Sequence, residues 1–154
     1  MKKHQLIFDK IKGLLYEQFG EDLNEYEEGT NLSIGNSGIW ISVDTQELTI
    51  GYGTNHRHYH SEFHDINEAL DDFFNLLTRK KRITEYYKGK YAYKIRTEIE
   101  NASGIFKELS TSLTWLFPYW KKTRTTVEIK QNLINYAEIE KQIVEIKNYA
   151  QQHV

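Results

Sequence analysis

Residues 31–60 read NLSIGNSGIWISVDTQELTIGYGTNHRHYH, and much of this stretch places apolar residues at every second position. This period is typical of strands that bury one face of a sheet. The runs are interrupted by Asn36-Ser37-Gly38 and by Asp44-Thr45-Gln46, which are residue types that favour tight turns. The stretch therefore predicts three short antiparallel strands, near 31–35, 38–43 and 47–52, and a fourth that continues from Gly53 to His60.

Helical periods flank this β-meander. Apolar residues at helical spacing predict three main helices, over residues 4–19, 66–78 and 133–150. Alternation from Lys90 to Glu100 predicts the clearest later strand, with others at 83–88 and 123–129, while residues 105–117 fit neither period well. Phe73 and Ile95 lie on the apolar sides of regular elements and are predicted core residues. We expect an α+β fold in one domain, residues 1–154, with an antiparallel sheet of six to eight strands carrying the helices.

Composition excludes several classes of site. The 154 residues contain no cysteine, which rules out disulfides and cysteine-ligated zinc. No apolar run approaches the ~18 residues that a membrane-spanning helix needs, and the first residues do not resemble a secretory signal. We therefore expect a cytoplasmic protein that does not engage a membrane. No phosphate-binding glycine loop or standard hydrolase motif occurs, so we expect no cofactor.

Charge is unevenly distributed along the chain. Residues 1–78 hold five Lys and Arg against 14 Asp and Glu, whereas residues 79–154 hold 15 against eight. The first part has a net charge of −9 and the second of +7, so a folded molecule that keeps them apart could steer oppositely charged partners.

Histidines are concentrated between residues 56 and 64. In a strand, His56, His58 and His60 would project from one face, which could suit a transition metal or acid–base catalysis. Solvated imidazoles at a sheet edge are the simpler interpretation. We therefore predict no metal site and no catalytic residue, and a histidine-based or metal-dependent enzyme is the third hypothesis for function.

The basic second part supports an alternative function. This part contains Arg79-Lys80-Lys81-Arg82 and later cations, interleaved with Tyr86, Tyr87 and Tyr119. The cations could hold phosphates and the tyrosine rings could stack on bases, as in a nucleic-acid-binding module. A solvated outer sheet face explains the same pattern.

Three features follow one another in the chain: the run from Ile50 to Gly53, the strand His56-Arg57-His58-Tyr59-His60, and the helix over Asp65–Leu77 with its Ala69-Leu70 pair. Together they resemble a pattern of small bacterial immunity proteins of polymorphic toxin systems. The resemblance covers residues 30–78. It implies a protein that neutralises a toxin by binding it, without chemistry of its own. The first functional hypothesis is therefore a non-enzymatic inhibitor of the immunity or antitoxin type.

An acidic patch would suit a toxin with a basic surface, such as a nuclease. Charge and expected exposure select the candidate partner-binding residues, which are Glu25, Glu27, Glu28, Asp44, Glu47, Asp71 and Asp72. The loop acids among them have no cation nearby in the sequence.

Overall fold

A computed structural model describes residues 2–60 and 62–152, and it confirms the α+β class with three helices and two antiparallel sheets. The chain divides into two compact units. Unit 1 is formed by residues 1–77 and 134–154, and unit 2 by residues 78–133. Each unit contains one of the two sheets and is described by itself below.

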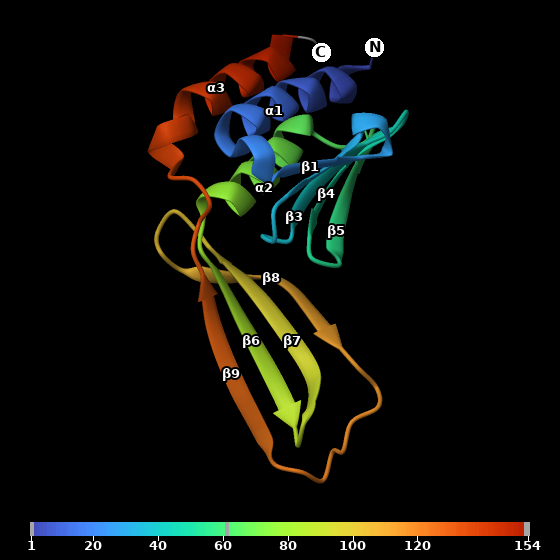
Figure 1. Cartoon of the computed structure of the whole chain (residues 1–154), viewed down its shortest axis with the longest axis vertical. Helices are drawn as coiled ribbons and strands as arrows, with labels where there is room; N and C mark the ends of the chain where they lie inside the picture. The colour runs from blue at the N-terminus through green and yellow to red at the C-terminus, as the bar shows by residue number, and fades with distance from the viewer. Residues whose placement is uncertain (1, 61, 153–154) are drawn as a thin grey trace. The chain divides into compact units, whose positions relative to one another are not determined.

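The sheet of unit 1 is the predicted meander with one more strand. Its order is β1-β2-β3-β4-β5, each strand antiparallel to the next (Figure 1). The strands are β1 (Leu23–Tyr26), β2 (Asn31–Ile34), β3 (Ile39–Val43), β4 (Glu47–Tyr52) and β5 (Asn55–His60). Ile41 pairs with Leu32 on one side and Ile50 on the other, and all three are buried. The period of two therefore marks the buried face correctly.

Three helices complete unit 1, close to the predicted positions. They are α1 (Lys3–Phe19), α2 (Ile66–Thr78) and α3 (Tyr136–Gln152). Figure 1 shows α1 and α3 side by side, and α1 also contacts β1, β3 and β4. Phe73 on α2 is fully buried, which confirms it as a core residue.

Unit 2 is a four-stranded antiparallel sheet in the order β8-β7-β6-β9. Its strands are β6 (Lys81–Lys88), β7 (Tyr91–Glu100), β8 (Phe106–Leu113) and β9 (Thr123–Lys130). β6 and β7 are joined by a tight turn, and Gly89 has the positive φ of 62° that such a turn requires. All residues between Lys81 and Lys130 are described, and none is helical. No helix of unit 2 therefore covers its own sheet, and all eight residues of β9 are exposed.

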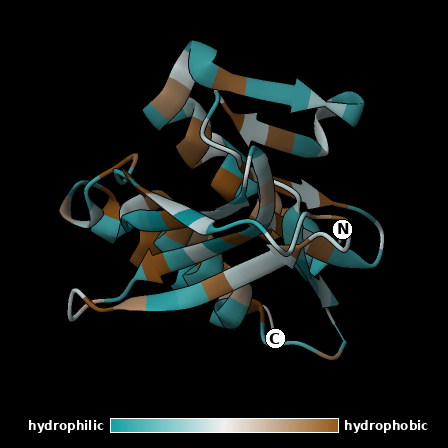
Figure 2. Cartoon of the chain, turned by 90° about the horizontal axis from the view of Figure 1, so that it is seen from below, coloured by the Kyte–Doolittle hydropathy of each residue, from teal (hydrophilic) through white to brown (hydrophobic). Residues whose placement is uncertain are grey.

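The structure differs from the sequence-based expectation in three respects. The described residues form nine strands rather than six to eight, in two sheets rather than one. β1 was not predicted, because only Leu23 of its four residues is buried and no alternation reveals it. Ile95 is 37% exposed, so its assignment to the core is wrong. Along several strands, hydrophilic and hydrophobic residues alternate (Figure 2). In unit 2, however, no second layer of that unit covers the apolar residues.

Candidate functional site

Most of the acidic candidates are bonded within unit 1. The Lys12 ammonium lies 2.9 Å from the Glu25 carboxylate, so Glu25 is paired in the fold although no cation lies near it in the sequence. Asp44 accepts hydrogen bonds from the backbone N–H groups of Gln46 (2.6 Å) and Glu47 (2.8 Å). These bonds, with the Gln46 bond the larger cause, hold the pKa of Asp44 below its usual value. The remaining ionic partners are His58 for Glu47, Lys147 for Asp71, and Arg57 for Asp72.

Glu27 and Glu28 remain as exposed acids without an ion pair in the described part of the chain. Their φ angles are 53° and 57°, the only positive values among the described residues other than glycine. The left-handed region is costly for a side chain of this kind. The turn is held by Thr30, whose backbone N–H and hydroxyl both donate to the Glu27 carbonyl, at 3.3 and 2.8 Å.

One polar network of unit 1 was not foreseen from the sequence. The Arg57 guanidinium on β5 lies 2.6 Å from Asp72 and 3.0 Å from Glu68, both on α2. The Tyr59 hydroxyl also donates to Asp72, and burial is the first cause that raises the pKa of Tyr59. The network ties β5 to α2. This makes Asp72 part of the internal structure of unit 1.

The histidines of β5 share a face, as predicted. His56 and His58 lie with ring centroids 4.9 Å apart, and His58 Nδ1 bonds the Glu47 carboxylate and, at 3.2 Å, the Thr49 hydroxyl. His60 instead lies against Phe63, with ring centroids 4.9 Å apart. No three His, Asp or Glu side chains within residues 2–60 and 62–152 are placed to hold a metal ion.

A glycine beside these histidines has a packing role. Trp40 lies across Gly51, its strand partner, and a Cβ at residue 51 would come within 2.0 Å of the indole ring. The indole Nε1 donates to the Gly53 carbonyl at 3.0 Å. The Gly51-Tyr52-Gly53 sequence therefore makes room for Trp40.

The basic stretch at residues 79–82 is not one exposed cationic surface. Lys81 is 2% exposed, its ammonium donates to the Arg79 carbonyl at 3.2 Å, and burial lowers its pKa to about 8. Arg82 instead forms a two-fold hydrogen bond with the buried Glu98, at 2.7 and 2.9 Å. This bond is the first cause of the lowered pKa of Glu98.

The most unusual surface lies in the connection between β8 and β9. Four large side chains project there almost free of the protein, and we call them the aromatic tip. They are Trp115, 94% exposed, Leu116, 89%, Tyr119, 75%, and Trp120, 73%. The sequence TWLFPYW overlaps residues 105–117, which fit neither the helical period nor the period of two. Its signal was the density of large apolar residues next to a proline, directly before Lys121 and Lys122.

The segment that carries the aromatic tip is anchored to the sheet of unit 2. Phe117 stacks on Tyr93 of β7, with centroids 4.6 Å apart and planes inclined by 25°. The Thr114 N–H donates to the Tyr93 carbonyl at 2.9 Å, and a turn is closed by the Lys121 N–H donating to the Pro118 carbonyl at 3.0 Å. Lys121 also lies beside Gly89 of the β6–β7 turn. These contacts hold the projecting residues in a defined segment.

The two units carry opposite charge. Unit 2 holds 13 Lys and Arg against five Asp and Glu, a net of +8. Unit 1 holds seven against 17, a net of −10. The division seen along the sequence is therefore sharper when the charges are counted by unit.

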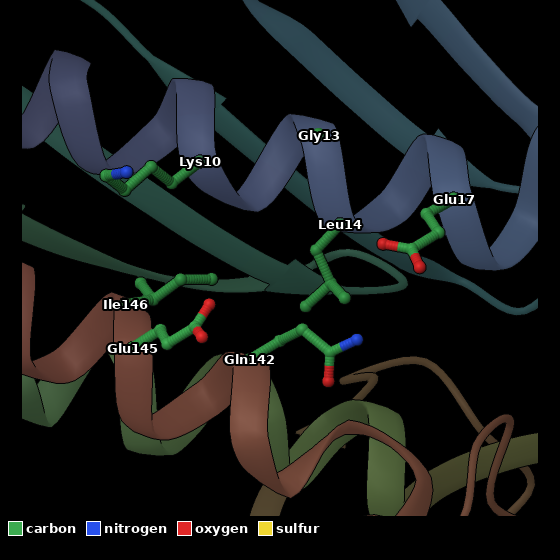
Figure 3. Close-up of a pocket in the computed structure, with 7 residues that line it drawn as sticks. All are labelled: Lys10, Gly13, Leu14, Glu17, Gln142, Glu145 and Ile146. Atoms are coloured by element: carbon green, nitrogen blue, oxygen red, sulfur yellow. The ribbon is translucent and has the colours of Figure 1, made fainter.

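A shallow depression in unit 1 lies between α1 and α3, with a volume of about 180 Å³ (Figure 3). Leu14 and Ile146 contribute apolar side chains, and Gly13 leaves open space. Lys10, Glu17, Gln142 and Glu145 complete the lining. This volume is below the ~300 Å³ typical of small-molecule sites, and the lining contains no histidine or hydroxyl that could pair with a carboxylate for catalysis.

Comparison with protein-family models, with curated proteins and with solved structures finds no match to this chain. No helix in the described ranges is long and apolar enough to span a bilayer.

Proposed function

We propose that this chain is a non-enzymatic binding protein that acts by holding a protein partner. The observation that carries the proposal is the aromatic tip. Large contiguous apolar surface is rare on soluble proteins and marks contact sites, and Trp and Tyr dominate the binding energy of protein interfaces. The segment is held by the Tyr93–Phe117 stack, so little ordering is needed on binding.

The narrower proposal is an inhibitor of the immunity or antitoxin type, in the cytoplasm of a bacterium. It is supported by the resemblance of residues 30–78 and by the charge of the two units. Unit 1, with its net charge of −10, suits the basic surface proposed for the toxin. Glu27 and Glu28 are the best placed of the acidic candidates, because the other five bond within the unit.

A nucleic-acid-binding module is the second candidate, favoured by the net charge of +8 on unit 2. Three of its tyrosines, however, already carry a cation over the ring. Lys94 lies 4.8 Å from the ring centroid of Tyr86, Arg124 lies 4.5 Å from that of Tyr87, and Lys90 lies 5.8 Å from that of Tyr91. Those ring faces are less available for stacking on bases, which favours a protein partner.

A titration tests the proposal. The probe is the product of a toxin gene adjacent to the gene of this chain, assayed for its own activity while the chain is added. A binding inhibitor is expected to abolish the activity at one equivalent per toxin. The double variant His56→Ala/His58→Ala should inhibit equally well, because the histidines are outside the proposed contact. Inactivation of many equivalents of toxin by one chain would instead demonstrate an enzyme and contradict the proposal.

A further inference from the structure

Two stretches of the chain adjoin the aromatic tip, and their sequences contain many cations and no carboxylate. Residues 86–97 and 109–127 include no Asp or Glu. The same two stretches contain Lys88, Lys90, Lys94, Arg96, Lys121, Lys122 and Arg124. Arg96 is paired with Glu98 and Glu108 farther along β7, whereas the other six cations are brought together at one end of the sheet, where β6 leads into β7 and β8 leads toward β9. The contact of Lys121 with Gly89 joins the two stretches.

From this arrangement we infer the chemistry of the surface that the tip binds: an acidic protein surface that carries apolar side chains among its carboxylates. The inference rests on the proposed function and assigns the partner class of one site. The cations would guide the approach, and the exposed indole rings and Leu116 would supply the apolar contact. Unit 1, with its net charge of −10, favours a basic partner surface, so the partner would carry one acidic and one basic surface.

The side chains of the tip favour a protein over single-stranded nucleic acid. Leu116, 89% exposed, has no ring to stack on a base and gains only by burial in an apolar site. Tyr119 and Trp120 meet edge to face, with planes at 86°, and do not present two parallel faces to successive bases. These side chains are therefore better suited to burial against an apolar protein surface than to stacking between bases.

A direct binding measurement can test the inference with defined probes. The first is a 20-residue Glu-rich peptide with Leu or Phe at every fourth position, and its control has Lys in place of each Glu. A 20-nucleotide oligo(dT) and vesicles of neutral and anionic phospholipid in a ratio of three to one represent the other anionic surfaces. Trp115 and Trp120 report binding, because burial of an exposed indole shifts its fluorescence to shorter wavelength.

We expect the acidic peptide to bind and shift the emission, and the Lys peptide not to bind. Trp115→Ala/Trp120→Ala should weaken binding by at least tenfold, followed by labelled peptide. Lys121→Glu/Lys122→Glu should slow association by at least tenfold with a smaller change in dissociation. The control Lys107→Glu/Lys141→Glu makes the same change in net charge at exposed residues outside the two stretches, and should change either rate less than threefold.

Absence of peptide binding, tighter binding of oligo(dT) or vesicles, or unchanged binding by both tip variants would each overturn the inference. The variants replace exposed residues, and circular dichroism would confirm that they fold. A chain that fails with the peptide but still inhibits its toxin at one equivalent would refute this inference while leaving the proposed function standing. Conversely, peptide binding by a chain that inactivates excess toxin would refute the function alone.

Discussion

Replacement of Phe73 by alanine is expected to lower the free energy of unfolding by about 3–5 kcal/mol. The ring is fully buried on α2 and packs edge to face against Phe74, with centroids 5.9 Å apart. Alanine would remove most of this apolar contact and leave a cavity that the surrounding helices and sheet could fill only partly. Urea unfolding followed by circular dichroism measures the loss from the shift in midpoint at constant slope.

Ile95→Ala provides the matched comparison for this prediction. It removes an apolar side chain from a regular element of unit 2, but that side chain is 37% exposed. We expect a loss below about 1 kcal/mol, because partly exposed side chains contribute less on burial. Similar losses at residues 73 and 95 would mean that the assigned core of unit 1 or the exposed face of unit 2 is wrong.

Replacement of Lys81 by methionine is expected to raise the free energy of unfolding at pH 7 by about 1–3 kcal/mol. The ammonium is buried, and burial lowers the pKa of Lys81 from 10.5 to about 8. At pH 7 the Lys81 side chain is therefore charged in both states, and this charge is less stable in the buried site of the folded protein than in the unfolded chain. Loss of the hydrogen bond to the Arg79 carbonyl offsets part of the gain.

The pH dependence gives this prediction a second readout. Between pH 8 and pH 10.5 the unfolded chain binds the proton at Lys81 more strongly than the folded protein does, so the contribution of Lys81 to stability rises with pH. The methionine variant lacks this contribution, and its advantage over the original protein should shrink across the same window. A variant that is less stable at pH 7, or whose difference from the original protein is the same at pH 7 and pH 10, would contradict the account.

Local periodicity explains why much of the fold could be predicted. The period of two in residues 31–60 arises from a sheet with one buried face, and the stripe on residues 66–78 from a helix that buries a wide side. β1 lacked such a signal because a single residue, Leu23, carries its burial. The division into two sheets could not be predicted from local sequence either, since the alternation along β7 is the same whether or not a second layer covers it.

The ion pairs could not be predicted, because they join residues that lie far apart in the sequence. Lys12 reaches Glu25, and Lys147 on α3 reaches Asp71 on α2, so carboxylates that look unpaired in the sequence are neutralised in the fold. Lys81 sits in a run of four cations, yet it alone of the charged residues in that run is buried. The exposure of the aromatic tip depends equally on where β8 and β9 place their connection, which no period in residues 114–122 reveals.

Hydrogen exchange of the chain, alone and in complex with the toxin proposed as its partner, tests the central claim most directly. The account predicts slower exchange in peptides covering residues 113–123, where the aromatic tip would be buried by the partner. It predicts no comparable change across β5, residues 55–60, whose histidines take no part in the proposed contact. Protection confined to β5, with residues 113–123 exchanging as fast in the complex as in the free chain, would contradict it.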